Sequence, residues 1–333
     1  MKKSFIIVFI TSLVGLSSCE NFEQKQDTIR VSVTKENLSE AQLSEIPLPD
    51  TSKVLKGNSV IVSSKMEIPA TEDEKLIVHH TAYSLLYSEE HEQSIWIAYE
   101  LTSEETKKAF NRSDDFIVDP LIKSGSANNN DYKGSGYDRG HLAPAADMSW
   151  SNQTMLESFY YSNMSPQDPS FNRGIWKKLE ELVRTWAVEN KSLYVVTGPI
   201  LNSGLSSIGP NKVSVPNYYY KVLLDYSQPE IKAIGFILSN QANKGNLAEF
   251  AVSIDRVEAM TGLNFFPNLP DTEESAIESK VCISCWSWKA VKMITDEKVK
   301  DTGTSIQCKG RTQSGSQCKR KTSDASGYCY QHQ

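Results

Sequence analysis

A histidine and an arginine lie two residues apart in the stretch YDRGHLAP, residues 137–144. The imidazole of His141 can take a proton from water near neutral pH, and the guanidinium of Arg139 can hold a phosphate oxygen. Gly140 between them can adopt backbone angles that other residues avoid. The pattern therefore predicts a site that handles phosphate. Short patterns of this kind also recur by chance, so the prediction depends on the motifs that follow.

Asn172 lies thirty-one residues after His141, at the beginning of a segment with the periodicity of an amphipathic helix that continues to about Glu189. A histidine on a strand followed by an asparagine at the start of a helix is the layout of a one-metal nuclease site. Asparagine is also a favoured helix cap, which is the alternative role for Asn172. The large apolar residues of the segment recur at intervals of three and four and are expected in the core: Ile175, Trp176, Leu179, Leu182, Val183 and Trp186.

Three motifs in this order resemble the DNA/RNA non-specific endonucleases of the ββα-metal (His-Asn finger) class. The first is DRGHLAP at residues 138–144, the second is SNMSPQ at residues 162–167, and the third is the N-x₃-W-x₃-E pattern at residues 172–180. The resemblance covers roughly residues 76–270. It implies an α+β fold in which a ββα-metal finger carries the active site.

The resemblance also implies a role for each motif residue. His141 is the general base that deprotonates the attacking water, which suits the unperturbed histidine pKa of about 6.5. Asn172 is the direct ligand of a hydrated Mg²⁺, with Mn²⁺ as an alternative, because a hard cation that keeps most of its waters fits a single carbonyl ligand. Arg139 and Arg112 neutralise the charge of the scissile phosphate. Asn163 supports the site by hydrogen bonding.

Glu180 follows Asn172 by eight residues, which places it about 80° around a helix and ~12 Å along it. This separation argues against direct coordination of one metal by both side chains. The resemblance implies instead that Glu180 binds a metal-bound water. Arg184, one turn later, would hold Glu180 or a phosphate. The pair also fits an ordinary i,i+4 ion pair on a helix surface, which is the alternative.

The function implied by the resemblance is Mg²⁺-dependent hydrolysis of phosphodiester bonds in DNA and RNA, with little sequence preference and with 5′-phosphate ends. The alternative is a catalytically inactive surface lipoprotein that keeps the fold and binds nucleic acid. A net charge of −6 argues against a protein that coats nucleic acid, although it allows a local basic cleft. The chain contains no HExxH, P-loop or GxSxG pattern, so zincin, NTPase and serine-hydrolase chemistry are not indicated.

Apolar and polar residues alternate from Leu76 to Leu101 around a polar run at residues 88–93, which predicts a β-hairpin. We expect an α+β domain over residues 72–270, with a central antiparallel sheet flanked by helices. Residues 271–300 are predicted to be a linker to a small separate module, residues 301–333. The further expected elements are strands at residues 193–197, 218–226 and 231–238 and a helix at residues 247–260.

The first eighteen residues have the composition of an export signal, with two lysines followed by an apolar run that is too short to span a bilayer. The sequence LSSC at residues 16–19 resembles a bacterial lipobox, so Cys19 is the expected lipidation site. An ordinary secretory peptide that happens to contain Cys19 is the alternative. Residues 19–71 are polar and predict a flexible tether. These features predict an exported lipoprotein anchored in a bacterial membrane, in the periplasm or at the cell surface.

The C-terminal residues contain three cysteines and a histidine that could form a tetrahedral zinc site: Cys308, Cys318, Cys329 and His332. A segment of about thirty residues cannot form a sufficient hydrophobic core, so it needs a metal or a covalent staple to fold. Disulfides are the alternative, since an exported location is oxidising. Cys282 and Cys285 are expected to pair with each other or to remain free. The tail is also locally basic, which suggests contact with nucleic acid.

Overall fold

The structure is a computed structural model that describes residues 65–227, 230–289, 306–312, 315–322 and 327–328. The predicted signal peptide, the lipidation site Cys19 and most of the tether lie outside these residues, as do Cys329 and His332. Among the described residues, no helix has the length and apolarity needed to cross a membrane.

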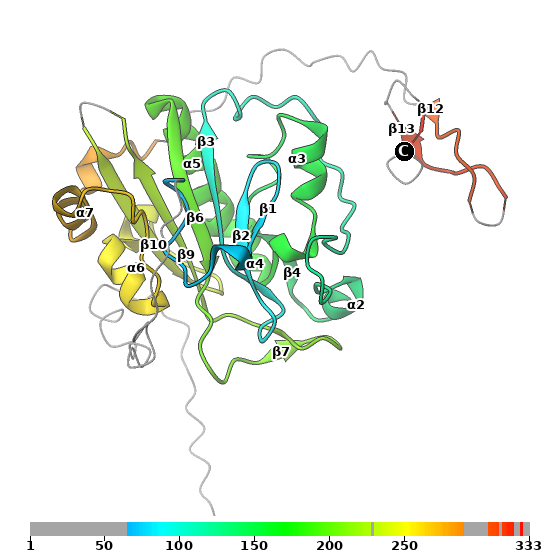
Figure 1. The fold of residues 1–333 in the computed structure, drawn as a ribbon, viewed down its shortest axis with the longest axis horizontal. Coiled ribbons are helices and arrows are strands. Elements are labelled where there is room, and N and C mark those ends of the chain that lie inside the picture. Colours follow the sequence, from blue (N-terminus) through cyan, green and yellow to red (C-terminus); the bar gives the residue numbers. More distant parts are fainter. Residues whose placement is uncertain (1–64, 228–229, 290–305, 313–314, 323–326, 329–333) are drawn as a thin grey trace, which may run out of the picture. The chain divides into compact units, whose positions relative to one another are not determined.

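A seven-stranded sheet forms the centre of the domain, and every neighbouring pair of strands is antiparallel (Figure 1). This confirms the predicted α+β class with a central antiparallel sheet. The expected hairpin and the three later strands are present. In spatial order the strands are β1 (Ile77–His79), β2 (Ser84–Ser88), β3 (Gln93–Thr102), β6 (Ser192–Pro199), β9 (Tyr218–Asp225), β10 (Lys232–Ser239) and β11 (Ala251–Val252).

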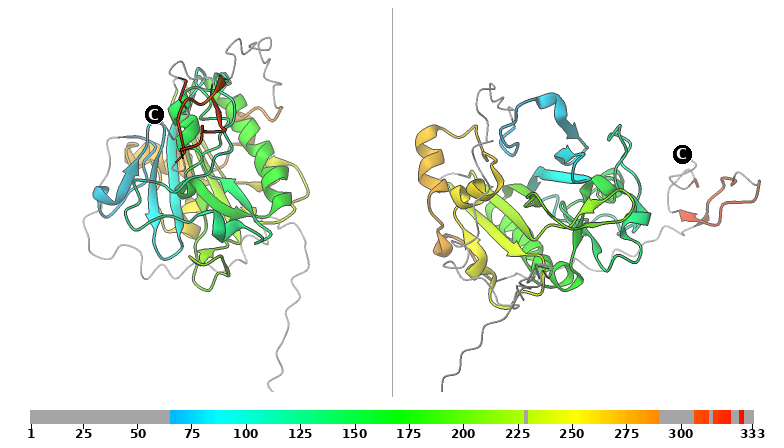
Figure 2. Two further views of the ribbon diagram at one scale, coloured as in Figure 1. Left: turned by 90° about the vertical axis from the view of Figure 1, so that its right-hand side faces the viewer. Right: turned by 90° about the horizontal axis from the view of Figure 1, so that it is seen from below.

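Both faces of the sheet are buried under apolar clusters. Successive side chains of a strand point to opposite faces, so each strand contributes to both clusters. In β3, Ile97 and Tyr99 belong to one apolar cluster, whereas Trp96 and Ala98 belong to another. We call these sides the α5 face and the α6 face, after the helices that pack on them, α5 (Lys177–Asn190) and α6 (Ile254–Thr261) (Figure 2). Residues of the first and third sequence motifs, Leu142 and Trp176, belong to the apolar cluster of the α5 face.

The predicted helix over residues 247–260 is wrong in its first half. A 3₁₀ turn, η5 (Leu247–Phe250), is followed by β11, which adds an edge strand beside β10. The helix α6 begins only at Ile254, after Ser253, whose side chain accepts a hydrogen bond from the backbone N–H of Arg256. A serine cap and a short edge strand therefore replace the first turns of the expected helix.

The segment predicted as a linker begins with ordered structure that packs on the domain. Helix α7 covers Asp271–Glu278, and a 3₁₀ turn, η6, covers Ile283–Cys285. Trp286 is 4% exposed, and its ring centroid lies 4.6 Å from that of Trp186 in α5. The linker prediction is therefore wrong for residues 271–288, because aromatic side chains of this segment complete the core of the α5 face.

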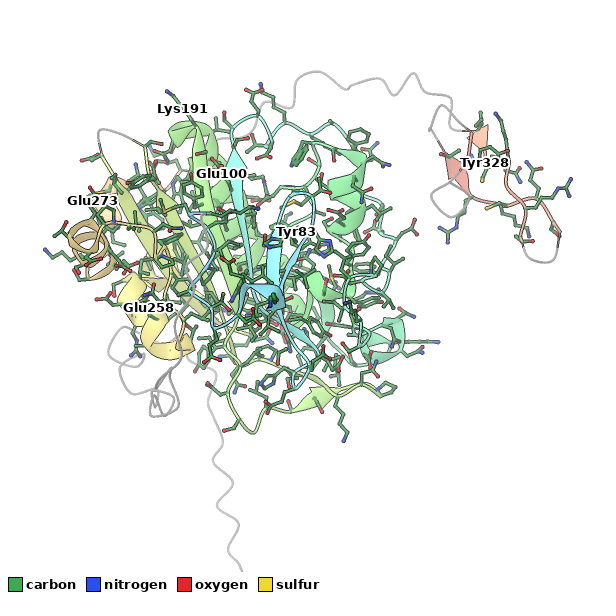
Figure 3. All side chains as sticks on the ribbon, viewed as in Figure 1. Tyr83, Glu100, Lys191, Glu258, Glu273 and Tyr328 are labelled. Carbon is green, nitrogen blue, oxygen red and sulfur yellow. A yellow bond between two sulfur atoms is a disulfide. The ribbon has the colours of Figure 1, made fainter. Side chains whose placement is uncertain are left out.

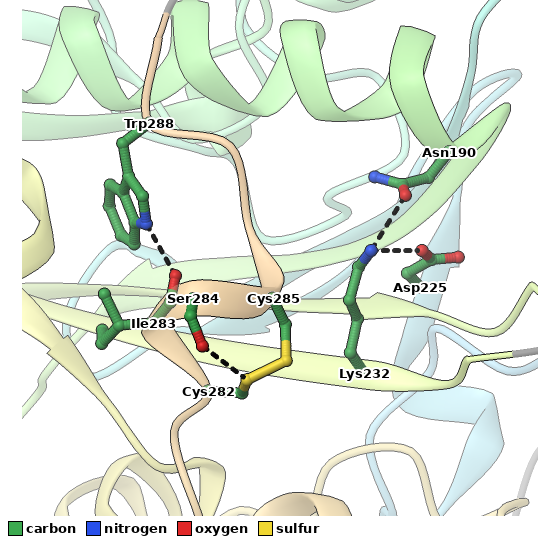
Figure 4. The surroundings of a disulfide bond; sticks show 8 residues. All are labelled: Asn190, Asp225, Lys232, Cys282, Ile283, Ser284, Cys285 and Trp288. Atoms are coloured by element: carbon green, nitrogen blue, oxygen red, sulfur yellow. Dashed lines mark hydrogen bonds and ion pairs between the residues drawn. A yellow bond between two sulfur atoms is a disulfide. The ribbon is translucent and has the colours of Figure 1, made fainter.

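Cys282 and Cys285 form a disulfide within this segment (Figure 4). Close to it, Lys232 in β10 forms an ion pair with Asp225 in β9, with an Nζ–Oδ2 distance of 3.3 Å. Of the two alternatives for Cys282 and Cys285, the structure has the paired one. The disulfide closes a tight turn immediately before Trp286.

Shorter elements complete the described chain. The C-terminal residues form a two-stranded ribbon in which Cys308 and Cys318 are buried together. This ribbon and the other shorter elements are small two-stranded sheets and short helices. They are η2 (Glu74–Leu76), α2 (Asn129–Tyr132), β4 (Asp138–His141), α3 (Asn152–Glu157), η3 (Tyr161–Asn163), β5 (Met164–Gln167), α4 (Pro169–Phe171), η4 (Asn172–Trp176), β7 (Ser207–Ile208), β8 (Val213–Ser214), β12 (Ile306–Gln307) and β13 (Lys321–Thr322).

Candidate functional site

The first two motifs form the two strands of a small antiparallel sheet. In the β4–β5 pair, Asp138 lies opposite Gln167 and His141 lies opposite Met164. The chain then continues through α4 and η4 into α5. Two strands followed by a helix are the ββα arrangement that the resemblance implied, and it brings the histidine motif beside the asparagine motif.

Gly140 is required for space rather than for unusual backbone angles. It is absent from the glycines with positive φ. A β-carbon at this position would lie 2.1 Å from the side-chain Cδ of Gln167 on the opposite strand. The expectation that Gly140 supplies backbone freedom is therefore wrong. Its role is to let Gln167 cross the ribbon.

The ring of His141 is almost enclosed, with 8% of the residue exposed. The ring of Phe159 meets it edge-on, with 5.0 Å between centroids, and no described residue hydrogen-bonds its buried Nε2. Burial, reinforced by the nearby charge of Arg112, lowers the pKa of His141 to about 3. The imidazole is therefore neutral at neutral pH and able to accept a proton.

Asn163 is fully buried and fixes the backbone that follows His141. Its Oδ1 accepts a hydrogen bond from the N–H of Ala143 at 2.8 Å, and its Nδ2 donates to the carbonyl of Ala143 at 2.9 Å. A third bond, from Nδ2 to the carbonyl of Ser158, measures 2.7 Å. The amide side chain therefore joins two loops behind the histidine, which is geometry suited to the supporting role expected for it.

Asp138 orients the side chain of Asn172. The Nδ2 group of Asn172 donates to Asp138 Oδ2 at 2.9 Å, and Arg173 donates to both carboxylate oxygens. Burial alone would raise the pKa of Asp138, but the hydrogen bonds from Arg173 and Asn172 and the charges of Arg173 and Arg139 lower it. With its NH₂ group held, Asn172 presents a carbonyl oxygen to which no described residue donates a hydrogen bond.

Asn172 does not act as a helix N-cap. It begins the π-helical turn η4, which joins α4 to α5 across a kink where Gly174 has φ −102° and ψ −110°. Asp168 is the N-cap residue of α4. The regular helix starts only at Lys177, so the single helix predicted from residue 172 is wrong in its first turn. A π-turn of this kind is common at functional sites, because it re-aims side chains.

Glu180 and Arg184 are not a surface pair, so that alternative is wrong. Arg184 is mostly buried, and its Nη1 lies 2.7 Å from Oδ1 of the buried Asp147. Tyr99 donates to the other oxygen of Asp147 at 2.8 Å. Glu180 receives no hydrogen bond from the described residues. Its carboxylate therefore remains available to a ligand or a water.

A buried lysine faces the carboxylate of Glu180 from the sheet. Lys221 in β9 is 0% exposed, and its Nζ has no hydrogen-bond partner among the described residues. The ammonium lies 5.1 Å from the centroid of the Trp176 ring. Desolvation raises the pKa of Glu180 to about 7, while the charges of Lys221 and Arg184 oppose the rise. The charge of Lys221 therefore partly compensates the buried carboxylate of Glu180 within the core of the α5 face.

The two remaining arginines lie on the same side of β4 as His141. The guanidinium of Arg139 stacks over the ring of Phe116 at 4.2 Å, and that of Arg112 lies 4.9 Å from the ring of Phe159. The charge of Arg112 lowers the pKa of both His141 and Glu180. Arg112 lies over the ring that packs on His141, and its side chain, which forms an ion pair with Asp114, is 51% exposed.

A cavity of about 260 Å³ opens beside Arg139 and Asp138. Its other lining residues come from α2 and the loop after it: Asn129, Tyr132, Lys133, Gly134 and Tyr137. The cavity offers space for a ligand next to the β4–β5 ribbon without entering the core.

Three site residues were missed or left without a role by the sequence analysis. Asp138 belongs to the first motif but received no role, and Asp147 and Lys221 were not considered. Lys221 did carry a signal, because it is a single charge within the apolar run YYYKVLLD of a central strand. A charge placed there is expected to be buried and compensated. Asp147 lies in an irregular segment and carried no comparable signal.

The residues present fit a hydrated divalent cation. Asn172 offers an unpartnered carbonyl oxygen held in place by Asp138, and Glu180 offers a carboxylate to which no described residue donates a hydrogen bond. Hard cations such as Mg²⁺ prefer oxygen ligands and retain several waters. The donor set therefore suits a metal bound through one side chain and several waters.

Comparison with known proteins agrees with this geometry. The family model for DNA/RNA non-specific endonucleases matches residues 63–272. Mitochondrial endonuclease G of Bos taurus is 34% identical over 203 residues, which covers 56% of this chain and 68% of the relative. A nuclease of Nostoc sp. strain PCC 7120 is 32% identical over 223 residues, covering 63% of this chain and 80% of the relative.

A solved structure of the EndoG/EndoGI complex, which concerns the inhibition of EndoG, contains a similar chain. The similarity has a TM-score of 0.56 at 33% identity and covers 58% of this chain and 86% of that one. The match to the family model extends over more than half of the sequence. The protein is a nuclease, and the chain belongs to the DNA/RNA non-specific endonuclease family.

Proposed function

We propose that this nuclease hydrolyses phosphodiester bonds of both DNA and RNA with little sequence preference, that it requires Mg²⁺, and that its products carry 5′-phosphates. The observation that carries the proposal is the hydrogen bond from Asn172 to Asp138, which leaves the carbonyl oxygen of Asn172 open beside the histidine motif. Mn²⁺ is the alternative metal.

His141 acts as the general base in this mechanism. Its ring is neutral at neutral pH, so it can take the proton of a water that attacks phosphorus. Its low pKa reflects burial and the charge of Arg112. A bound phosphate diester brings a negative charge, which opposes the effect of Arg112 and strengthens the base when substrate is present.

Arg112 and Arg139 hold the phosphate. Their guanidinium groups lie over aromatic rings next to His141, which limits their motion. Arg112 donates through Nε to Asp114 and Arg139 donates through Nη1 to Asn129, and their other nitrogen atoms stay able to donate to a phosphate. Asn172 would hold the metal, and Glu180 would accept a hydrogen bond from one of its waters. When bound, the ion supplies positive charge that stabilises the phosphorane-like transition state and the departing 3′ oxygen.

Product analysis tests this proposal. The purified full chain is incubated with supercoiled plasmid and with structured RNA, in Mg²⁺ or in EDTA. Cleavage of both substrates in Mg²⁺ and not in EDTA is expected, with DNA ends that DNA ligase can rejoin without kinase treatment. Activity in EDTA, or ends that require a kinase, would contradict it. Binding without cleavage in any divalent metal would favour the inactive nucleic-acid-binding protein.

We also propose that Cys308, Cys318, Cys329 and His332 bind structural Zn²⁺. The buried pair Cys308 and Cys318 supports this, since the described part of the ribbon buries no larger apolar cluster. Native mass spectrometry should find one zinc per chain. A metal-free mass lowered by the hydrogens of disulfides in the tail would contradict it.

The basic tail is proposed to contact nucleic acid. Deletion from Asp301 onward removes five basic residues and two acidic ones: Lys309, Arg311, Lys319, Arg320, Lys321, Asp301 and Asp324. It should weaken DNA binding and reduce the salt dependence of the affinity. Unchanged affinity and salt dependence would refute this role.

The lipobox-like sequence supports the proposal that the protein is exported and anchored through Cys19. In a bacterial host, Cys19→Ser should release the protein from the membrane fraction. A Ser18→Ala variant, which keeps the cysteine, serves as the control. Equal membrane association of wild type and Cys19→Ser would exclude a lipid anchor at this residue.

A further inference from the structure

Three carboxylates meet on the α6 face, away from the residues assigned to the nuclease reaction. Asp255 and Glu258 lie one turn apart on α6, and Glu278 is the last residue of α7. One carboxylate oxygen from each residue lies within 4.8 Å of the other two. Glu258 is marked on α6 in Figure 3, with Glu273 marked on the neighbouring α7.

Glu278 distinguishes this group from an ordinary acidic surface. The residue is 4% exposed, and its Oε1 is buried without a hydrogen-bond partner among the described residues. The charges that act on it come from three other carboxylates, Glu258, Glu274 and Asp255. Burying a carboxylate among like charges is costly unless a proton or a cation compensates.

We propose that Asp255, Glu258 and Glu278 bind a divalent cation of the size of Ca²⁺. All three oxygens lie within 4.8 Å of one another, which is close enough for one ion to bind them together. Three carboxylates in an irregular arrangement suit Ca²⁺, which takes about six to eight oxygen ligands in flexible geometry. Mg²⁺ usually keeps several waters and binds through one or two carboxylates.

The surroundings allow the ion to enter and to keep water ligands. Asp255 is exposed and Glu258 is half-buried, so one side of the site is open. The backbone N–H of Phe265 donates to Glu258 Oε1 at 2.8 Å, which fixes that carboxylate. Without an ion, burial and the neighbouring acids raise the pKa of Glu278 to about 9 and that of Glu258 to about 7. At neutral pH and without a cation, Glu278 therefore carries a proton.

The cation would join α7 to the body of the domain. Asp255 and Glu258 lie within the family match, which ends at residue 272, whereas Glu278 lies beyond it. The three carboxylates repel one another across α6 and α7. A cation bound by two ligands from α6 and one from α7 would replace this repulsion with an attraction that holds the helices together. The site is independent of the catalytic metal, because none of its ligands belongs to the β4–β5 finger.

Calcium titration of the full chain tests the proposal. Asn172→Ala is introduced to remove the proposed catalytic ligand, and the protein is stripped with EDTA before calorimetry and thermal unfolding in CaCl₂. We expect one Ca²⁺ per chain with a Kd on the order of 10⁻⁴–10⁻³ M, and a rise in Tm. Asp255→Asn and Glu278→Gln should each weaken binding by roughly tenfold or more.

Asp271→Asn is the matched control, because it removes one exposed acid from α7 outside the three ligands. It should leave calcium affinity unchanged. The proposal is overturned by no binding up to about 10 mM CaCl₂, a limit well above the expected Kd range, by tighter binding of Mg²⁺ than of Ca²⁺, or by equal weakening in the control. Asp255 is exposed, so its variant keeps the test valid if Glu278→Gln fails to fold.

Discussion

The two faces of the central sheet bury apolar cores of comparable composition, yet they treat charge differently. On the α5 face, charges of both signs enter the core together: Asp147 pairs with Arg184, and Lys221 faces Glu180. On the α6 face, the charges near the core are carboxylates that act on one another, as at Glu258 and Glu278. The first arrangement sets each buried charge beside one of opposite sign, and the second sets acids beside one another.

This difference shows where chemistry can be expected in the fold. Fixed charges of opposite sign can orient a reacting phosphate and a water, because their positions are set before the substrate arrives. Uncompensated acids of one sign instead respond to the solution, to its pH and to its calcium. Changes on the α5 face should therefore alter the reaction, and changes on the α6 face should alter stability.

The largest effect is expected from His141→Ala. Removing the proposed general base should lower the rate of cleavage by about 10²–10⁴-fold, with DNA affinity retained. Plasmid cleavage and fluorescence anisotropy measure the two quantities. Glu258→Gln on the opposite face should keep the full rate. A similar loss of activity in both variants would break the distinction between the faces.

Asp138→Asn should have the next largest effect. An asparagine at this position cannot hold the amide of Asn172 and the guanidinium of Arg173 as a carboxylate does, so the metal ligand loses its orientation. A loss of roughly 10–100-fold in apparent Mg²⁺ affinity or rate is expected, as for other residues that orient metal ligands. Rates measured across Mg²⁺ concentrations test this. Arg173→Gln keeps the bond between Asp138 and Asn172 and should cost less; the reverse order would contradict the assigned role.

Lys221→Met should change the pH dependence of the reaction. The charge of Lys221 holds down the pKa of Glu180, which is about 7 in the folded protein. Without the lysine, the pKa of Glu180 rises, and the ionised carboxylate forms only at higher pH. The acidic limb of kcat should therefore move to higher pH. On that limb, the rate at a given pH should fall roughly tenfold if the pKa of Glu180 rises by about one.

Lys232→Met is the control for this change, because Lys232 lies on the neighbouring strand and pairs with Asp225. Lys232→Met should leave the acidic limb of the pH profile of kcat at the same pH. If the acidic limb of Lys221→Met stays at the pH of the wild type, the pKa of Glu180 does not depend on the lysine.

The smallest effect on the reaction is expected from Glu278→Gln, which should change stability alone. The pKa of Glu278 is raised to about 9 from an ordinary value of 4.5, so the folded state binds more protons between these pH values. The free energy of unfolding should therefore fall as pH rises through this window in EDTA, and the variant should lose that decline.

His141 contributes to the pH dependence of stability with the opposite sign. Its folded pKa of about 3 lies below the ordinary histidine value of 6.5, so stability should rise with pH between those values. Urea titrations at several pH values measure both trends. An unchanged decline in Glu278→Gln would place the titration elsewhere and weaken the contrast between the faces.

The sequence predicted most of the fold because its signals were local and periodic. The apolar spacing around Trp176 and Leu182 identified a helix, and the alternating hairpin and the later apolar runs identified strands of the sheet. The helix expected over residues 247–260 was wrong where a capped start at Ser253 and an edge strand interrupted it. The linker prediction missed α7. Residues 271–278 are acidic, as is typical of a solvated linker, yet they form a helix that packs on the domain.

The site was predictable only for residues within motifs. His141, Asn172 and Glu180 were predicted from their spacing and the family resemblance. The partners of Glu180 come from a distant strand, and no spacing within one segment encodes a contact between Lys221 and α5. Asp138 stood within the first motif, but its role depended on a hydrogen bond across thirty-four residues. Such contacts are set by tertiary packing rather than by local pattern.

The contact between Trp186 and Trp286 has a consequence for the order of folding. The two rings are one hundred residues apart in the chain, and Trp186 Nε1 also donates to the carbonyl of Ser287. During synthesis, helix α5 therefore emerges long before the residues that cover its outer end. Contacts across such long loops form late. The α5 face, which carries the proposed catalytic residues, is sealed only when the chain has been made as far as Trp288.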